Sequence, residues 1–169
     1  MKNHISNFLE SMNVTIKQAY EKDVSQIVEM LGEFAAFENL SDYCEITEEK
    51  LKDAMFGEKP CVEGLMAFAE NEPVGYALFF ENFTSFRGQR GVYLEDLYIK
   101  PEFRRLKIGE AFLKKLAQIA KERSCERIDF LVLDWNAPAI KFYKKFGAEI
   151  NAEERHFRFA GEAFENLND

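Results

Sequence analysis

One stretch of the sequence, residues 91–121, predicts a strand, a basic loop and a helix in immediate succession. Residues 92–99 are rich in β-branched, aromatic and leucine residues on both faces, which is typical of a central strand covered on both sides. Pro101 ends this strand. Behind the loop, apolar residues at helical spacing predict a helix over 108–122: Ile108, Phe112, Leu116, Ile119 and Ala120.

Two adjacent carboxylates, Glu95 and Asp96, lie in the middle of this apolar strand. Successive strand residues point to opposite faces, so the alternation predicts one carboxylate on each face. Burying an unpaired charge is costly. We therefore expect at least one of the two acids to face a cleft.

The loop between the strand and the helix carries three cations, Arg104, Arg105 and Lys107. A helix N-terminus offers unpaired N–H groups and the positive end of the helix dipole. Together with the cations, this end suits a phosphate or pyrophosphate. A solvated basic turn explains the same residues without a ligand, so the loop alone does not identify a site.

Two segments resemble the GNAT-superfamily acetyltransferases. The loop resembles their motif A, Arg/Gln-x-x-Gly-x-Gly/Ala after a strand, and residues 133–148, LDWNAPAIKFYKKFGA, resemble motif B. Tyr-Leu-Glu-Asp at 93–96 and Trp-Asn at 135–136 narrow the resemblance to the spermidine/spermine (diamine) and thialysine N-acetyltransferases. It runs from residue 14 to residue 159. It implies an α/β (α+β) GNAT fold with a mixed, mostly antiparallel sheet of about six to seven strands and about four helices.

The resemblance implies acetyl-CoA as co-substrate and no metal. Backbone groups of Leu97, Tyr98 and Ile99 are expected to bind the pantetheine arm and thioester. The loop is expected to hold the pyrophosphate through its backbone, from Arg104, Arg105, Leu106, Lys107, Ile108, Gly109 and Glu110. The motif departs from the family pattern, because Arg105 and Lys107 stand where the family has glycine. The charge of Lys107 either compensates for the lost glycine or its bulk weakens coenzyme binding.

The resemblance assigns the catalytic roles to Tyr143 and Glu95. Tyr143 is expected to protonate the departing thiolate, on a helix whose Asn136 and Ala139 contact the cofactor. Glu95 is expected to act as the base through a water molecule. The alternatives are a tyrosine that fills the core and a salt-bridged acid at a strand edge.

The acceptor residues are carried over by the same resemblance: Phe37, Glu38, Glu95, Asp96, Asp129, Phe130, Leu131 and Glu154. Polyamine acetyltransferases have an Asp-Pro-Trp in the loop before the central strand, where this chain has Thr84, Ser85, Phe86 and Arg87. The exchange removes an acid and adds a cation. A diamine or a lysine-like amine is therefore at least as plausible an acceptor as a long polyamine.

The composition of the chain limits its possible partners and its possible chemistry. The net charge of −8 does not favour a nucleic-acid partner, and no apolar run reaches the ~20 residues that span a bilayer. Three cysteines far apart, with His4 and His156 near the termini, do not form a nucleophile–base pair. We expect a cytoplasmic protein with one GNAT domain over residues 1–169, in which 1–12 are a possible N-terminal extension. The resemblance implies a homodimer.

Three functions follow as hypotheses. The first is direct acetyl transfer from acetyl-CoA to a small cationic amine, and the second is the same chemistry on a protein or peptide amine. The third is a degenerate GNAT domain that binds acyl-CoA without turnover. Elsewhere we expect helices over 24–35, 48–56, 137–146 and 162–167, strands over 14–19, 65–70, 74–80, 128–133, 149–150 and 156–159, and a loop over 82–90.

Overall fold

The structure, a computed structural model, describes residues 13–168 of the chain. The possible extension over residues 1–12 lies outside the described part. Contacts divide the chain into two compact units, residues Met1–Leu131 and Val132–Asp169, and each is described here by itself. The single domain that the sequence suggests therefore stays a prediction.

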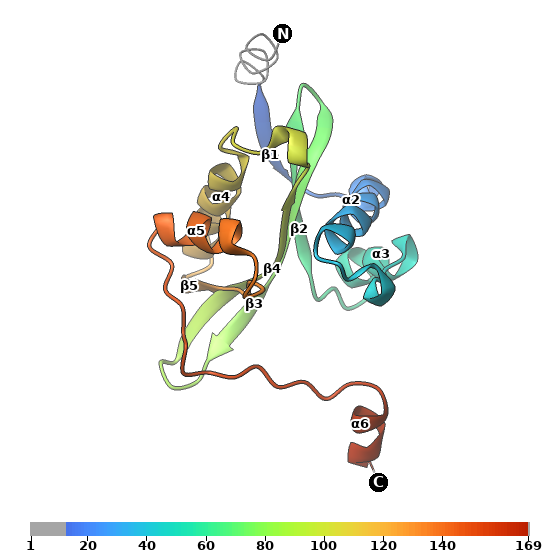
Figure 1. The fold of residues 1–169 in the computed structure, drawn as a ribbon, viewed down its shortest axis with the longest axis vertical. Coiled ribbons are helices and arrows are strands. Elements are labelled where there is room, and N and C mark those ends of the chain that lie inside the picture. Colours follow the sequence, from blue (N-terminus) through green and yellow to red (C-terminus); the bar gives the residue numbers. More distant parts are fainter. Residues whose placement is uncertain (1–12, 169) are drawn as a thin grey trace. The chain divides into compact units, whose positions relative to one another are not determined.

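The first unit is built on a sheet of five strands in the order β1-β2-β3-β4-β5 (Figure 1). The strands β1 to β4 pair antiparallel with their neighbours, whereas β5 joins β4 in parallel. Their bounds are β1 Val14–Gln18, β2 Glu63–Ala69, β3 Glu72–Thr84, β4 Gln89–Ile99 and β5 Cys125–Asp129. The strand predicted to be central, β4, does have a neighbour on each side.

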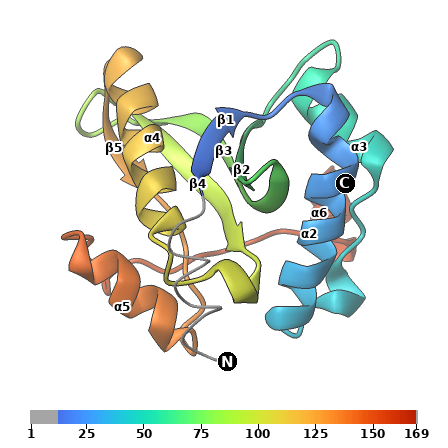
Figure 2. The same ribbon diagram turned by 90° about the horizontal axis from the view of Figure 1, so that it is seen from above.

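Three long helices cover the two faces of this sheet (Figure 2). The helices α2 (Val24–Phe37) and α3 (Glu48–Phe56) pack on one face, and α4 (Ile108–Glu122) packs on the other. The start of α3 is fixed by Thr47, whose hydroxyl accepts a hydrogen bond from the Lys50 N–H at 3.2 Å.

The helix α4 is amphipathic, as predicted, and its apolar stripe is buried against the sheet, where it contacts β4 and β5. Phe112 and Leu116 are completely buried in this cluster. Just after α4, Arg123 is held by Glu63 of β2, with Nη2 to Oε2 at 2.7 Å, and by Glu81 of β3. The helix is thus fixed along its length by apolar packing and beyond its end by charge.

Some predicted bounds are wrong. The last strand of the sheet is β5, Cys125–Asp129, and residues 130–133 add no strand to it. In β3 the strand continues to Thr84, so that only residues 85–88 form the loop before β4. The described residues contain five strands, fewer than the expected six or seven.

The second unit contains α5 (Ala137–Lys145), the short α6 (Glu162–Glu165) and a final turn of 3-10 helix (η4, Asn166–Asn168). The helix α5 and the tail helix were predicted. The two final strands, over 149–150 and 156–159, were not found. These residues are exposed and have no strand partner, and alternating polar and apolar residues do not make a strand without a partner.

Candidate active site

A β-bulge lies at the point where β4 carries its two carboxylates. Leu78 of β3 pairs with Asp96 and Phe79 pairs with Leu94, which leaves Glu95 as the extra residue. The bulge interrupts the alternation from which we expected one carboxylate on each face. Asp96 comes two residues before Tyr98 and shares its face, toward α2, while Leu94 and Leu97 both pack toward α4.

The strands β4 and β5 separate just before this bulge. Their last paired residues are Tyr93 and Asp129, whereas β4 continues to Ile99. The Lys100 N–H donates to Val74 at 3.0 Å, so alternate residues, Leu97 and Ile99, direct their backbone groups away from β3. Beyond Tyr93 this edge of β4 no longer faces β5. It can therefore pair with an extended ligand that carries amide groups.

The loop after β4 has the backbone conformation that glycine favours, although it carries none at the positions concerned. Arg105 and Lys107 have φ of 70° and 62°, in the left-handed region. Holding a residue with a Cβ there costs about 1 kcal/mol. Both side chains are exposed, and Lys107 is the N-cap of α4. The loop thus keeps the left-handed backbone at the two glycine positions of the motif and adds two cations beside the helix N-terminus.

The side chain of Arg104 interacts with other groups of the protein. Its guanidinium carbon lies 4.8 Å from the ring centre of Phe37 and 5.8 Å from that of Tyr98. Its Nε donates to the Ile99 carbonyl at 3.0 Å. Arg104 therefore joins the last residue of α2 to the end of β4, while its backbone remains in the loop.

The ring of Tyr98 is held from a second side. Its hydroxyl donates to Glu33 of α2 at 2.9 Å, and burial together with this carboxylate raises the pKa of Tyr98 to about 12. Glu33 was not predicted as a site residue. A signal was present, because Glu33 lies one helical turn before Phe37 on α2.

Two carboxylates that were predicted to contact the acceptor share the α2 side of the sheet. Burial, and then the charges of Glu95 and Glu38, raise the pKa of Asp96 to about 7. Glu38 is the C-cap residue of α2, and burial raises its pKa also. Glu95 itself is exposed on the bulge. The structure thus brings Glu38, Glu95 and Asp96 close enough for their charges to interact.

The remaining acceptor candidates of this unit lie at the end of β5. Asp129 accepts a hydrogen bond from Asn82 Nδ2 at 3.0 Å and forms an ion pair with Arg127, so its carboxylate is already held by protein groups. Phe130 is half-buried and Leu131 is exposed.

The second unit holds the residues predicted from motif B. Asn136 is buried and caps α5, accepting a hydrogen bond from the Ala139 N–H at 3.2 Å. The ring of Tyr143 is half-buried and lies 5.1 Å from that of Phe142. Burial raises the pKa of Tyr143 to about 12, so its hydroxyl carries a proton at neutral pH. Glu154 is exposed in the segment after α5.

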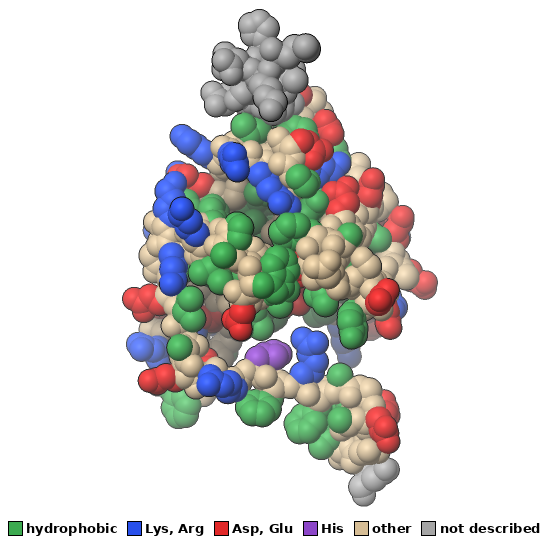
Figure 3. All heavy atoms as spheres, in the orientation of Figure 1, with side chains coloured by type: hydrophobic (Ala, Val, Ile, Leu, Met, Phe, Trp, Pro, Cys, Tyr) green, Lys and Arg blue, Asp and Glu red, His purple; other side chains and the backbone are tan. Residues whose placement is uncertain are grey.

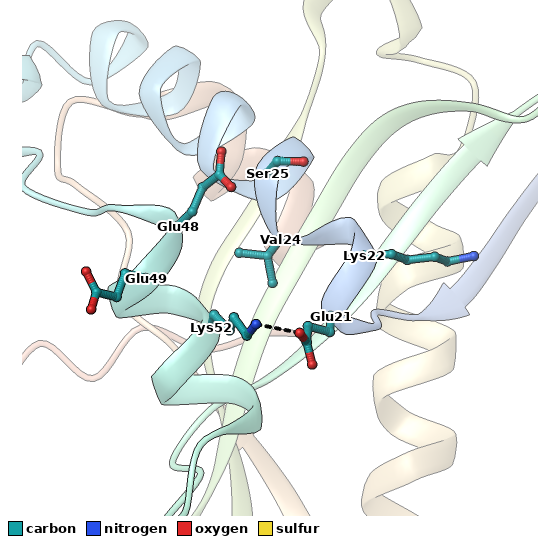
Figure 4. A pocket seen from close by; sticks show the side chains of 7 residues that line it. All are labelled: Glu21, Lys22, Val24, Ser25, Glu48, Glu49 and Lys52. Carbon is teal, nitrogen blue, oxygen red and sulfur yellow. Dashed lines mark ion pairs between the residues drawn. The ribbon is translucent and has the colours of Figure 1, made fainter.

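A hollow between the start of α2 and the start of α3 contains none of the predicted site residues (Figure 4). An ion pair of 2.6 Å between Lys52 and Glu21 crosses it, and both side chains are exposed. Exposed pairs of this kind contribute little to stability. The hollow is lined by Glu21, Lys22, Val24, Ser25, Glu48, Glu49 and Lys52.

Acidic side chains are prominent over α2 and α3, at the right of the space-filling view (Figure 3). Within residues 13–168, no group of three or more His, Cys, Asp or Glu side chains is arranged to hold a metal ion. The three cysteines, Cys44, Cys61 and Cys125, are free. No helix of the described part has both the length and the apolar character needed to cross a bilayer.

The fold and the site define the class of protein. Residues 27–148 match the acetyltransferase (GNAT) family, and the chain belongs to this family. The predicted fold class and the predicted acetyl-transferring enzyme are thereby confirmed.

Two proteins with similar sequences and one with a similar structure indicate which members of the family the chain resembles. The thialysine N-epsilon-acetyltransferase of Bos taurus is 40% identical over 165 residues, covering 91% of this chain and 96% of that protein. The human spermidine/spermine N(1)-acetyltransferase-like protein 1 is 34% identical over 154 residues, 85% of this chain and 22% of that protein. An integron cassette protein from the mobile metagenome of V. cholerae has a solved structure with a TM-score of 0.79 and 26% identity, covering 94% of this chain and 99% of that one. The predicted resemblance to the diamine and thialysine branch is confirmed.

Proposed function

We propose that this protein transfers the acetyl group of acetyl-CoA directly to a primary amine of a small cationic acceptor. The observation that carries the proposal is the edge of β4 that β5 leaves open beside the phosphate-type loop. An extended thioester arm with amide groups fits such an edge. The acceptor class is that of a diamine, a polyamine or a lysine-like amine, as the names of the bovine and human relatives suggest.

The chain offers backbone groups for each part of the coenzyme. Leu97 presents its backbone groups and Ile99 its N–H along the open edge of β4, and residues 105–110 provide N–H groups at the start of α4. The exposed side chains of Arg105 and Lys107 add positive charge where a pyrophosphate would lie. From the second unit we assign Asn136, Ala139 and Tyr143 to the same ligand, by their match to motif B.

The reaction needs two proton movements that side chains of this chain can perform. An alkylamine has a pKa of ~10.4 and reacts only after it loses a proton. We assign this removal to the adjacent carboxylates Glu95 and Asp96. The amine nitrogen then bonds to the thioester carbonyl carbon as the carbon–sulfur bond breaks, and Tyr143 gives its proton to the departing thiolate. The proton that the new amide nitrogen loses restores the hydroxyl of Tyr143. The net products are the amide, the free thiol and one proton.

The acceptor would enter on the side of β4 that carries negative charge. Glu38 at the end of α2 lies close enough to Asp96 for their charges to interact, so both carboxylates would attract an ammonium group. Further contacts are assigned to Asp129, Phe130, Leu131 and Glu154. Direct transfer in a ternary complex is the proposed order, because Cys125 is buried and burial raises its pKa.

Replacing Tyr143 by phenylalanine tests the acid. Tyr143→Phe should lower kcat by about 10²–10⁴-fold, because the leaving thiolate loses its proton donor. The KM for acetyl-CoA should change little, since the ring is retained. Steady-state kinetics over a range of acetyl-CoA concentrations measure both, with Phe142→Tyr as a control for the ring cluster. An unchanged kcat removes Tyr143 from the mechanism.

An acceptor panel separates the proposed function from its alternatives. Thialysine, 1,3-diaminopropane, spermidine and a lysine-containing peptide should be tested with acetyl-CoA, and the small amines should be preferred. Preference for the peptide would favour a protein or peptide acetyltransferase. Calorimetric binding of acetyl-CoA without acetylation of any amine would favour a domain that binds without turnover. The predicted homodimer and cytoplasmic location remain expectations, which light scattering and fractionation can test.

A further inference from the structure

The strand β5 is held to the sheet by a short ladder of backbone pairs. It is the last strand in the order, and within residues 13–168 three residue pairs join it to β4, with a shift of register between Arg90 and Val92. The third pair, Tyr93 with Asp129, is the point where the two strands separate. Residues 130–133 continue the apolar run, yet they add no pair, so the apolar pattern does not set the end of the pairing.

A carboxamide of β3 reaches across β4 to this last pair. Asn82 lies opposite Gly91 of β4, and its Nδ2 donates to Oδ2 of Asp129 at 3.0 Å. The other carboxylate oxygen of Asp129, Oδ1, forms an ion pair with Arg127 of the same strand. The side chain of Asp129 is thus held toward β3, over the part of β4 that precedes the separation. A slip of β5 along β4 would break its contact with Asn82.

The glycine at position 91 leaves room for this crossing. A Cβ on Gly91 would lie 2.3 Å from Oδ1 of Asn82 and 2.8 Å from Cγ of Arg127, closer than real Cβ atoms approach other heavy atoms. The backbone of Gly91 is not left-handed, so the space above it, and not its φ, calls for glycine. A side chain at position 91 would therefore displace the carboxamide of Asn82 from Asp129.

The orientation of the Asn82 carboxamide leaves one of its own atoms unpaired. Its Oδ1 is buried and has no hydrogen-bond partner among the described residues. Turning the group over would place this oxygen against the carboxylate of Asp129, which only accepts hydrogen bonds when it is ionised. Asn82 therefore keeps an unsatisfied acceptor while it donates to Asp129. Unpaired buried polar atoms are uncommon in folded proteins, and this one is explained if the contact between β3 and β5 has a function.

We propose that Asn82, Gly91 and Asp129 form a clamp that fixes where β5 leaves β4, and so keeps the edge of β4 beyond Tyr93 open for the arm of acetyl-CoA. The inference rests on the proposed function, in which that arm pairs with the open edge. It deepens that function by naming the residues that hold the edge open. Asn82 and Gly91 act through β5 and are positioning residues. Without the clamp, the apolar run after Asp129 can pair with β4 and compete with the coenzyme for the same backbone groups.

Amide hydrogen exchange tests the clamp in the free protein. Asn82→Leu keeps the approximate size of the side chain and removes the donor, so the amides of β5 should exchange about tenfold faster. The amides of β2, on the other side of β3, should exchange as in the wild type. The double variant Asn82→Asp/Asp129→Asn keeps one carboxylate and one carboxamide in the pair and should restore the protection of β5. Unchanged exchange of β5 in Asn82→Leu would overturn the clamp.

Binding of coenzyme A tests the consequence for the open edge. Asn82→Leu and Gly91→Ala should each raise the Kd for coenzyme A by about 5–10-fold, because one hydrogen bond to a charged group is lost. The Kd for ADP, which carries the pyrophosphate without the arm, should stay unchanged. Gln89→Ala is the matched control, since it removes another side-chain contact between β4 and β5, Gln89 Nε2 to Glu126 Oε2 at 2.5 Å, at the start of β4. It should leave both Kd values unchanged.

The clamp and the proposed function fail in different ways. Equal losses of affinity for coenzyme A and ADP in Asn82→Leu would show a general structural defect and overturn the positioning role. Acetylation of an amine by the wild-type protein, with a Kd for coenzyme A that Asn82→Leu does not change, would reject the clamp and keep the transferase function. Faster exchange of β5 in Asn82→Leu that the double variant reverses, in a protein that binds no coenzyme A, would support the clamp and reject the transferase function.

Discussion

The two faces of β4 differ in what they carry, although both are packed under helices. Toward α4 the strand contributes Val92, Leu94 and Leu97 to an apolar cluster without charged members. Toward α2 it contributes Asp96 and Tyr98, beside a buried hydroxyl, an arginine and further carboxylates. One face follows the ordinary rules of core packing, and the other departs from them at several positions. Such departures are expected where a protein binds a ligand.

The largest effect that this comparison predicts concerns the apolar face. Phe112→Ala should lower the free energy of unfolding by about 3–5 kcal/mol, because it leaves a cavity in a fully buried cluster. Denaturant unfolding measures the loss. Phe86→Ala is the matched control, since Phe86 is fully exposed in the loop before β4 and its truncation should change stability by less than about 0.5 kcal/mol. Equal effects of the two changes would contradict the assigned core.

The next effect concerns Asp96 and depends on pH. Because folding raises its pKa from an ordinary 3.8 to about 7, the proton binds the folded state more tightly. Its contribution to stability is complete below about pH 4 and is lost as the pH rises through 7. Asp96→Asn should therefore raise the free energy of unfolding by about 2–4 kcal/mol at pH 8, relative to wild type. The difference should vanish at pH 4, and unfolding curves that show the same difference at both pH values would refute the prediction.

Removing the hydroxyl group should change stability by a smaller amount, and with opposite signs, at two tyrosines on the α2 face. Tyr76→Phe removes a buried hydroxyl without a partner and should stabilise the fold by about 1 kcal/mol. Tyr98→Phe removes the hydrogen bond to Glu33 and should destabilise it by about 1–2 kcal/mol. Thermal unfolding of the two variants is the measurement. A loss of stability in both would show that the Tyr76 hydroxyl has a partner in the folded protein.

The smallest effect concerns the loop that leads from β4 to α4. Arg105→Gly should stabilise the protein by about 0.5–1 kcal/mol, because glycine adopts a φ of 70° without strain. Arg105→Ala keeps the Cβ and should bring no such gain, so it is the control. A rise in the melting temperature of a few degrees for the glycine variant alone would confirm the left-handed backbone.

The helices and the central strand could be predicted because their patterns are local. The apolar period of α4 and the helix over residues 48–56 were both predicted from the sequence, and both occur where they were expected. The end of β5 could not be predicted in this way. An apolar run continues past Asp129, but pairing with β4 stops there, and pairing is decided by the partner strand.

The site was predicted less completely than the fold. Glu38 and Asp96 were named from the family resemblance, whereas the bulge at Glu95 was not foreseen, since alternation in a sequence gives no sign of an extra residue. The buried hydroxyl of Tyr76, which has no partner among the described residues, was not foreseen because a tyrosine in an apolar strand usually serves the core. The left-handed Arg105 and Lys107 were noted only as lost glycines, because side-chain identity does not fix the sign of φ.

The stacking of Arg104 on Phe37 and Tyr98 bears on whether binding of one reactant would affect the site of the other. One cation sits between the helix end that would meet the amine and the strand end that would meet the coenzyme. A shift of the loop on coenzyme binding would therefore pull on the ring of Phe37 as well. If both reactants bind as we propose, Arg104 would couple their two sites, because it contacts residues of each.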